Sequence, residues 1–337
     1  MTALFTDAEL RPVDRSTLER FAACPAQACY VEQNSPPAGL AAAVGQEAHQ
    51  AISRTIQAYI ESSEVTGPQS FRERFESETR CARPDVQPEV IRVLRGVWWK
   101  LSEYIAGNIA PDNILRFDGG LGGRSGQLSW PVEDLGVVLT SEVDLLHATR
   151  SRELLCECDW KTGWGHYDEQ DVFDSFQFQM HAYLVLRNYE SVEALRVIVW
   201  NTRNGSRSRP VEFARSDLAS IETRIRSAVG HYLTYSGKPY ELAETWPATE
   251  KCRICAAAAN CPVADLATQE CDRDPVQFVE KMIAVSARLD AMSAEATAYC
   301  DKTGKSIVTP SGTCFGRDKP RAERKAAAVL YERKNAE

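Results

Sequence analysis

The sequence predicts an α/β fold, a mixed sheet flanked by helices, and three observations lead to it. Three short strands are expected to follow one another, near 127–133, 136–147 and 153–161. A segment with helical periodicity comes next, near 170–188, and the apolar, β-branched run ALRVIVWN at 194–201 predicts a central strand. With a helix at about 40–62 ahead of them, the elements run in the order helix, three strands, helix, strand.

The other elements are predicted from local signals, beginning at the N-terminus. A capping box that starts at Ser16 predicts a helix that begins at 17 and carries Cys24 near its end. The polar, proline-punctuated stretch at 64–90 predicts an insertion, and the glycine-rich stretch at 119–126 predicts a flexible turn. Further helices are expected, in chain order, at about 89–109, 217–235 and 275–300.

Two of the predicted strands end near acidic side chains. Asp144 lies in SEVDLL, and Asp159 lies in CECDWKTG with Lys161 two residues later. Because side chains alternate along a strand, Asp159 and Lys161 point to the same face, with Asp144 supplied by the neighbouring strand. Two carboxylates can hold Mg²⁺ or Mn²⁺, and a lysine can stabilise negative charge on a phosphate. A single D-x-K triplet is common in exposed strands, so the motif alone does not establish a nuclease.

The cysteines indicate a metal site. The chain has 11 of them, and Cys252, Cys255 and Cys261 form C-x2-C-x5-C. The N-terminus shows no signal peptide and no apolar run is long enough to cross a membrane, so we expect a cytoplasmic protein, in which disulfides are rare. Three clustered thiolates need a distant fourth ligand, and composition alone favours zinc on four cysteines.

The charge balance argues mildly against a nucleic-acid partner. The formal net charge is −8, whereas a nucleic-acid binder usually carries a basic footprint. Basic residues do gather in two places, the loop with Arg203, Arg207 and Arg209 and the tail at 317–337. Either group is a candidate DNA contact or plain solvated surface.

Taken in order, the motifs resemble those of a known family. The chain offers Gly45 and His49 as G-x-x-x-H, then Asp144, then Asp159-x-Lys161, then Gln179-x-x-x-Tyr183, preceded by the SxLxxFxxCP motif at 16–25. This set is similar to the PD-(D/E)XK nuclease superfamily, in particular to its RecB-like branch, which includes the nuclease domains of RecB and AddB. The resemblance covers about residues 16–262. That family usually has glycine where this chain has Ser141.

The resemblance implies a restriction-endonuclease-like αβββαβ core with helical additions, and it assigns roles to the site residues. Asp144, Asp159 and the main-chain carbonyl of Trp160 would ligate Mg²⁺ or Mn²⁺, and His49 would complete a Mn²⁺-type site. Lys161 would orient the attacking water and offset phosphate charge. Gln179 and Tyr183 would position the lysine or the strand backbone.

The resemblance also implies an iron–sulfur staple. Its iron–sulfur members take the fourth ligand from the N-terminal motif, so Cys24 would join Cys252, Cys255 and Cys261 in a [4Fe–4S] site, with Cys29 as the alternative fourth ligand. The chain would then have four segments. Residues 1–39 form an N-terminal helix with the first cluster cysteine, and residues 40–245 form a nuclease core with a helical insertion at about 64–118. Residues 246–270 form the cysteine loop, and residues 271–337 form a helical extension with a basic tail.

The function expected from the resemblance is a metal-dependent DNA exonuclease or endonuclease in recombination, repair or phage DNA processing. Its partners would be DNA, as single strands or duplex ends, and a helicase or recombination protein. Two alternatives stay open: a non-catalytic iron–sulfur scaffold that binds nucleic acid or a helicase, and a zinc-stapled adaptor.

Overall fold

The computed structural model describes most of the chain up to residue 243. The described residues are 10–34, 39–120, 122–149, 154–243, 255, 261, 291, 294, 297–303, 307–308 and 314–315. The chain divides into two compact units, Met1–Ala23 with Pro36–Ser236 and Cys24–Ser35 with Gly237–Glu337. All the candidate catalytic residues belong to the first unit, and all the candidate cluster cysteines belong to the second.

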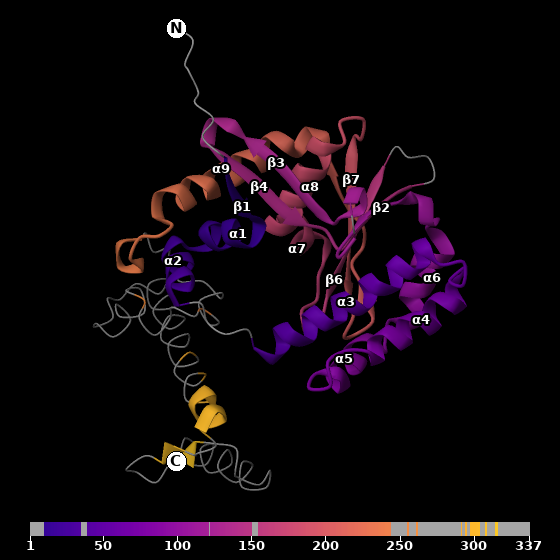
Figure 1. The fold of residues 1–337 in the computed structure, drawn as a ribbon. Coiled ribbons are helices and arrows are strands. Elements are labelled where there is room, and N and C mark those ends of the chain that lie inside the picture. The colour runs from indigo at the N-terminus through magenta and orange to yellow at the C-terminus, as the bar shows by residue number, and fades with distance from the viewer. Residues whose placement is uncertain are drawn as a thin grey trace, which may run out of the picture. The chain divides into compact units, whose positions relative to one another are not determined.

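A six-stranded mixed sheet forms the centre of the first unit (Figure 1). Strand β5 pairs antiparallel with β2 and β6, and β6 pairs parallel with β7. Strands β8 and β9 both pair antiparallel with β7. The bounds are β2 Ile114–Phe117, β5 Leu145–Ala148, β6 Leu155–Lys161, β7 Ala194–Asn201, β8 Ser206–Arg207 and β9 Val211–Ala214. The predicted mixed α/β fold is confirmed.

The predicted strand at 136–147 is two strands that belong to different sheets. Its first half, β4 (Val137–Glu142), pairs with β1 (Arg11–Asp14) and β3 (Gln127–Val132) in a smaller sheet. Its second half, β5, joins the central sheet. Between them, the Val143 amide donates to the Gly126 carbonyl (3.0 Å) and the Asp144 carbonyl accepts from the Asp118 amide (3.1 Å). Asp144 therefore lies where the chain passes from one sheet to the other.

The glycine-rich stretch before β3 is closely packed at this crossing. A Cβ atom at Gly126 would lie 2.5 Å from the Val143 carbonyl oxygen. Only glycine allows the backbone to approach so closely. The stretch was predicted to be a flexible turn, and the structure instead gives Gly126 a specific packing role beside Asp144.

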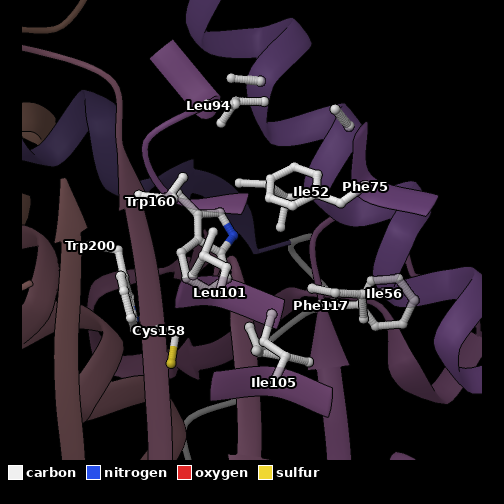
Figure 2. Packing of buried hydrophobic residues seen from close by; sticks show 14 of the residues in the cluster. Ile52, Ile56, Phe75, Leu94, Leu101, Ile105, Phe117, Cys158, Trp160 and Trp200 are labelled. Carbon is white, nitrogen blue, oxygen red and sulfur yellow. The ribbon is translucent and has the colours of Figure 1, made fainter. Parts of the chain in front are cut away.

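Four helices cover one face of the central sheet and bury a large apolar core against it (Figure 2). Cys158 and Trp160 of β6 face this core, together with Ile198 and Trp200 of β7. The stretch at 64–90, predicted as an insertion, contains the helix α4. The single helix predicted at 89–109 is in fact two helices, α5 and α6. The bounds are α3 Leu40–Glu61, α4 Pro68–Arg80, α5 Gln87–Leu94 and α6 Trp98–Asn108.

The helix predicted at 170–188 is also two helices, and the second of them lies against the sheets. Asp168 caps α7 (Glu169–Asp174) by accepting a hydrogen bond from the Asp171 amide (2.8 Å). The chain then turns at Ser175, and α8 (Phe176–Asn188) packs against β3, β4, β7 and α9 (Leu218–Tyr235). Helix α1 (Arg15–Ala23) packs against α8 and α9. Gln177 lies in the first turn of α8 and contacts Lys161 and Asp159 of β6.

The second unit contains α2 (Pro25–Asn34), directly after Cys24. The rings of Tyr30 and Tyr240 meet edge to face at 5.4 Å. Strands β10 (Ile307–Val308) and β11 (Cys314–Phe315) pair antiparallel. Most of the predicted helix at 275–300 and all of the tail at 317–337 lie outside the described residues. Among the described helices, none has the length and apolar character needed to cross a membrane.

Candidate active site

Strand β6 separates the apolar core from the candidate site by simple alternation. Cys158 and Trp160 point into the helical core, whereas Glu157, Asp159 and Lys161 point to the opposite face, towards α8. Asp159 is 2% exposed and Glu157 is fully buried. Buried carboxylates are costly unless they are paired, so their partners define the chemistry of this face.

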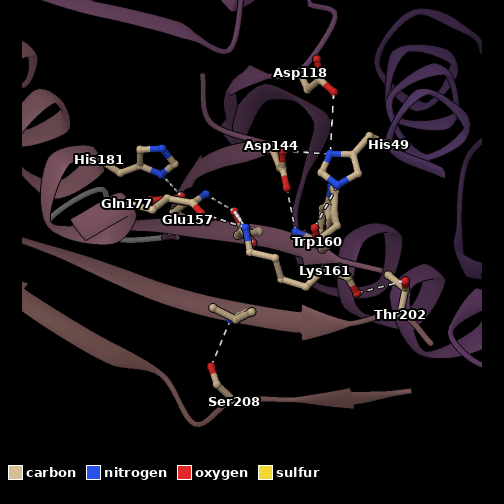
Figure 3. Close-up of polar contacts among 12 residues, drawn as sticks. His49, Asp118, Asp144, Glu157, Trp160, Lys161, Gln177, His181, Thr202 and Ser208 are labelled. Carbon is tan, nitrogen blue, oxygen red and sulfur yellow. Dashed lines mark hydrogen bonds and ion pairs between the residues drawn. The ribbon is translucent and has the colours of Figure 1, made fainter. Parts of the chain in front are cut away.

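Asp159, Lys161 and Gln177 form a closed polar triangle, of which Figure 3 labels Lys161 and Gln177. The Lys161 Nζ atom lies 3.1 Å from Asp159 Oδ1 and 2.9 Å from Oδ2. It also donates to Gln177 Oε1 (2.8 Å), and the Gln177 amide donates to Asp159 Oδ1 (2.6 Å). Asp159 Oδ2 is buried, and its contact with the Lys161 ammonium is an ion pair without hydrogen-bond geometry. The ammonium group is therefore held in place by both carboxylate oxygens and by Gln177.

The glutamine beside Lys161 is thus Gln177, and not the predicted Gln179. Gln179 accepts a hydrogen bond from Arg224 (2.8 Å) and donates to the Phe173 carbonyl (2.9 Å), both away from Asp159. Tyr183 is 2% exposed and lies under the Arg187 guanidinium, 5.1 Å from the ring centre. No described contact joins Gln179 or Tyr183 to Lys161, because α8 begins at Phe176 and presents its first turn to β6.

His49 of α3 links the second candidate carboxylate to the backbone of β6. Its Nδ1 atom lies 3.2 Å from Asp144 Oδ1, and its Nε2 atom lies 2.9 Å from the Trp160 carbonyl oxygen. The other oxygen of Asp144 accepts from the Trp160 amide at 2.7 Å. The three predicted ligands His49, Asp144 and the Trp160 carbonyl are therefore neighbours. An imidazole gives a metal ion one of its two nitrogens, and these two contacts use opposite nitrogens, so only one of them can represent two ligands of the same ion.

Asp118 is a member of this group that the sequence did not suggest. His49, Asp118 and Asp144 each offer a ligand atom, and these atoms all lie within 4.8 Å of one another. Asp118 follows β2, a strand inside the range predicted to be a helical insertion. An acidic residue before the Gly119–Gly120 pair was the available signal.

The crowded carboxylates perturb one another. Burial raises the pKa of Asp118, and the charge of Asp144 raises it further. Burial also raises the pKa of Asp159, with Lys161 opposing and Asp144 adding to the shift. Burial alone would lower the pKa of His49, but Asp144, Asp159 and Asp118 outweigh it and raise that pKa to about 9. A divalent cation would relieve this excess of negative charge, so the donor set fits a metal ion.

A pocket of about 330 Å³ adjoins Lys161. The helices α1, α7 and α8 contribute to its wall, and so does the loop that follows β6. Its lining residues are Glu19, Lys161, His166, Tyr167, Asp171, Ser175, Gln177 and Phe178. Lys161 is therefore accessible to a ligand from outside the protein.

The three arginines predicted to contact nucleic acid have different surroundings. Arg203 donates to Glu89 (3.1 Å) and to the Thr162 carbonyl (2.9 Å), so its guanidinium is largely satisfied within the protein. Arg207 lies over the rings of Tyr104 and Trp200. Arg209 is 86% exposed, with Glu169 at 3.3 Å. Of the three, Arg209 has the most accessible charge.

A buried polar chain lies directly behind Asp159. His181 of α8 contacts Glu157 Oε1 through Nδ1 (2.5 Å), and neither residue is exposed (Figure 3). The other ring nitrogen, Nε2, lies 2.8 Å from Ser141 Oγ. This chain ties α8 to β4 and β6. It places a hydroxyl at 141, where the resemblance suggested glycine.

One comparison with known proteins found a match. The family model for the PD-(D/E)XK nuclease superfamily matches residues 15–262. No curated protein matches the chain. The matched span exceeds half of the 337 residues and includes His49, Asp118, Asp144, Asp159 and Lys161. The chain therefore belongs to the PD-(D/E)XK nuclease superfamily, whose members hydrolyse phosphodiester bonds with divalent metal ions.

Proposed function

We propose that this protein is a metal-dependent deoxyribonuclease that cuts DNA as an exonuclease or endonuclease, in recombination, repair or phage DNA processing. The observation that carries the proposal is the ion pair between Lys161 and the buried Asp159, together with the His49, Asp118 and Asp144 group. In phosphodiester hydrolysis, a carboxylate can hold the metal ion that activates water, and an ammonium fixed beside it can offset the charge of the phosphate. The motif order supports placement in the RecB-like branch.

Each residue of the site has a separate task in this proposal. His49, Asp144, Asp159 and the Trp160 carbonyl would hold Mg²⁺ or Mn²⁺, with Asp118 beside them. When bound, the ion would lower the pKa of a coordinated water and offset developing charge.

Lys161 orients the attacking water and offsets the charge of the phosphate. Gln177 keeps the Lys161 ammonium in place, since it accepts from Nζ and donates to Asp159. In this proposal Gln177 positions Lys161, the role that was predicted for Gln179.

The proposal is tested with oligonucleotides labelled at the 5′ or the 3′ end, in Mg²⁺, Mn²⁺ or EDTA. Cleavage that requires the metal supports it, and the end label reports the polarity. A protein that binds the oligonucleotide without cutting it under any of these conditions would instead support the non-catalytic scaffold.

We expect His49→Ala to weaken cleavage supported by Mn²⁺ more than cleavage supported by Mg²⁺. Imidazole suits transition metals better than it suits Mg²⁺, so its loss removes a ligand that mainly benefits Mn²⁺. The Mn²⁺ concentration that gives half-maximal cleavage should rise about tenfold or more. Metal titrations of the wild type and the variant measure this change.

Asp118→Asn provides the comparison for that variant. It removes a charge from the same group and leaves the imidazole, so its effect should be similar for the two metals. A His49→Ala protein with lower stability and unchanged metal dependence would make His49 a structural histidine.

We also propose that the second unit holds a [4Fe–4S] cluster on Cys24, Cys252, Cys255 and Cys261. Cys24 belongs to the same compact unit as the distant cysteine loop, although more than two hundred residues separate them. Cys252 lies outside the described residues. Four thiolates suit either such a cluster or zinc, so the choice depends on metal analysis.

We expect Cys24→Ser to remove the brown colour of the anaerobically purified protein and to lower its thermal stability. A metal site that is absent from the unfolded chain adds its binding free energy to folding, so the loss of one ligand acts on stability. Visible absorption and iron content report the cluster, and thermal unfolding reports the stability.

Cys29→Ala is the matched control, since Cys29 lies five residues away and is the alternative ligand. It should keep the colour. Colour that persists in Cys24→Ser and disappears in Cys29→Ala would reassign the fourth ligand. A colourless wild-type protein that contains one zinc per chain would show that the four cysteines bind zinc and not a cluster.

A further inference from the structure

Trp164 is an exposed indole on the loop that follows the catalytic strand. Its side chain is 77% exposed, the highest value among the large apolar side chains of the described part of the chain. It comes three residues after Lys161, and His166 and Tyr167 of the same loop line the pocket beside Lys161. A single exposed apolar residue is ordinary on a protein surface. The surroundings of Trp164 are what set it apart.

The loop that carries Trp164 is anchored at several points. Asn201, 2% exposed at the end of β7, donates through its amide to the carbonyls of Gly163 (3.1 Å) and Gly165 (2.5 Å), the two neighbours of Trp164. The Thr202 amide donates to the Lys161 carbonyl at 2.9 Å. The backbone on both sides of the indole is therefore fixed to the central sheet.

Arg203 supports the indole ring. Its guanidinium carbon lies 4.5 Å from the ring centre. The same guanidinium is held by Glu89 and by the Thr162 carbonyl, so it cannot swing away without losing both partners. An arginine stacked on tryptophan gives a cation–π contact and holds the ring in one orientation. One part of the ring is covered in this way, and the remaining surface faces solvent.

We propose that Trp164 is a stacking platform for an unpaired base of the strand that is cut at Lys161, so that single-stranded DNA or a frayed end is the substrate. Three residues of extended chain span at most about 11 Å, which keeps the indole within a few nucleotides of the scissile phosphate. Every base has a flat face that can stack on an aromatic ring, but a paired duplex hides those faces. This inference rests on the proposed nuclease function.

The test measures binding separately from cleavage. A fluorescein-labelled oligothymidylate is titrated with the full-length protein in EDTA, and the anisotropy gives the Kd. Trp164→Ala should weaken binding about 5- to 140-fold, the range for loss of one stacked base, whereas Trp164→Tyr should keep most of the affinity. Affinity for a blunt duplex of the same length should not change.

Trp99→Ala is the matched control. Trp99 is also exposed, at 50%, and an arginine, Arg72, lies 5.7 Å from its ring centre. It belongs to α6 and lines a different cavity from the pocket beside Lys161. An abasic site is then moved along the oligonucleotide. At one position it should weaken wild-type binding and leave Trp164→Ala unaffected, which would identify the stacked base.

The outcomes separate this inference from the nuclease function. Binding that depends on Trp164 without any metal-dependent cleavage would support the platform and overturn the nuclease. Cleavage and binding that are both unchanged in Trp164→Ala would support the nuclease and overturn the platform. Equal losses on single strands, duplexes and abasic strands would also overturn it, and would make Trp164 a general contact or a site for a protein partner.

Discussion

Lys161→Ala and Asp159→Asn are each expected to lower metal-dependent cleavage by about 100-fold or more. Removal of one group that stabilises developing charge typically costs on the order of 10²–10³ in rate. Lys161 contacts both oxygens of Asp159 and the side chain of Gln177, so neither change can be compensated by a neighbour already in place. Initial rates on an end-labelled oligonucleotide, at saturating Mg²⁺ and at saturating Mn²⁺, measure the effect.

Folding must be checked in the same samples, because Lys161→Ala leaves a buried carboxylate without its cation. Asp159→Asn keeps the side-chain volume and removes the charge, so it is the gentler of the two variants. Asp112→Asn alters an exposed carboxylate on a turn and should cleave like the wild type. A wild-type cleavage rate in a folded Asp159→Asn protein would place the active site elsewhere.

The side of β6 on which Asp159 and Lys161 lie could be predicted, because side chains alternate along a strand whatever its tertiary surroundings. Strand β7 was predicted at its observed bounds, and α3 and β6 within one or two residues, since their apolar patterns are long and regular. The single strand predicted at 136–147 was wrong, because its halves pair with different strands. Such pairing is a long-range property that a local pattern does not contain.

The glutamine shows how a motif spacing can be right for one helix face and still select the wrong face, since Gln179 was chosen for its i, i+4 spacing from Tyr183 and Gln177 is the residue beside Lys161. Successive residues of a helix are about 100° apart, so Gln177 and Gln179 point in quite different directions. The sequence suggested a helix from about 170, whereas α8 begins at Phe176 after a capped turn. Asp118 was missed for a related reason, since β2 lay inside a range predicted to be helical.

His181→Ala is expected to lower the free energy of unfolding by about 3–5 kcal/mol, the usual cost of leaving a buried charged or polar partner unpaired. Glu157 and His181 are both fully buried, and Glu157 Oε2 accepts no hydrogen bond, so the contact with His181 Nδ1 at 2.5 Å is the main compensation for this carboxylate. Urea denaturation in EDTA measures the change and avoids any contribution of bound metal.

Two further variants separate the contacts of His181. Ser141→Ala removes only the hydroxyl that meets Nε2 and should cost about 1 kcal/mol. Glu157→Gln keeps an acceptor for Nδ1 and should be milder than His181→Ala. If His181→Ala instead stays within about 1 kcal/mol of the wild type, Glu157 does not depend on the imidazole.

This buried chain also bears on catalysis, because Glu157 and Asp159 share one face of β6. In His181→Ala, Glu157 would lose its partner two residues before Asp159. The strand should then shift, or water should enter beside Glu157, so His181→Ala should also slow cleavage.

Ser141 is the third member of the chain, at a position where the family resemblance suggested glycine. Glycine at 141 would leave His181 Nε2 without its partner, so in this protein the hydroxyl and the imidazole are expected to depend on each other. A double-mutant cycle between Ser141→Gly and His181→Ala should therefore give a coupling free energy of about 1 kcal/mol, and strictly additive losses would show that the two residues act independently.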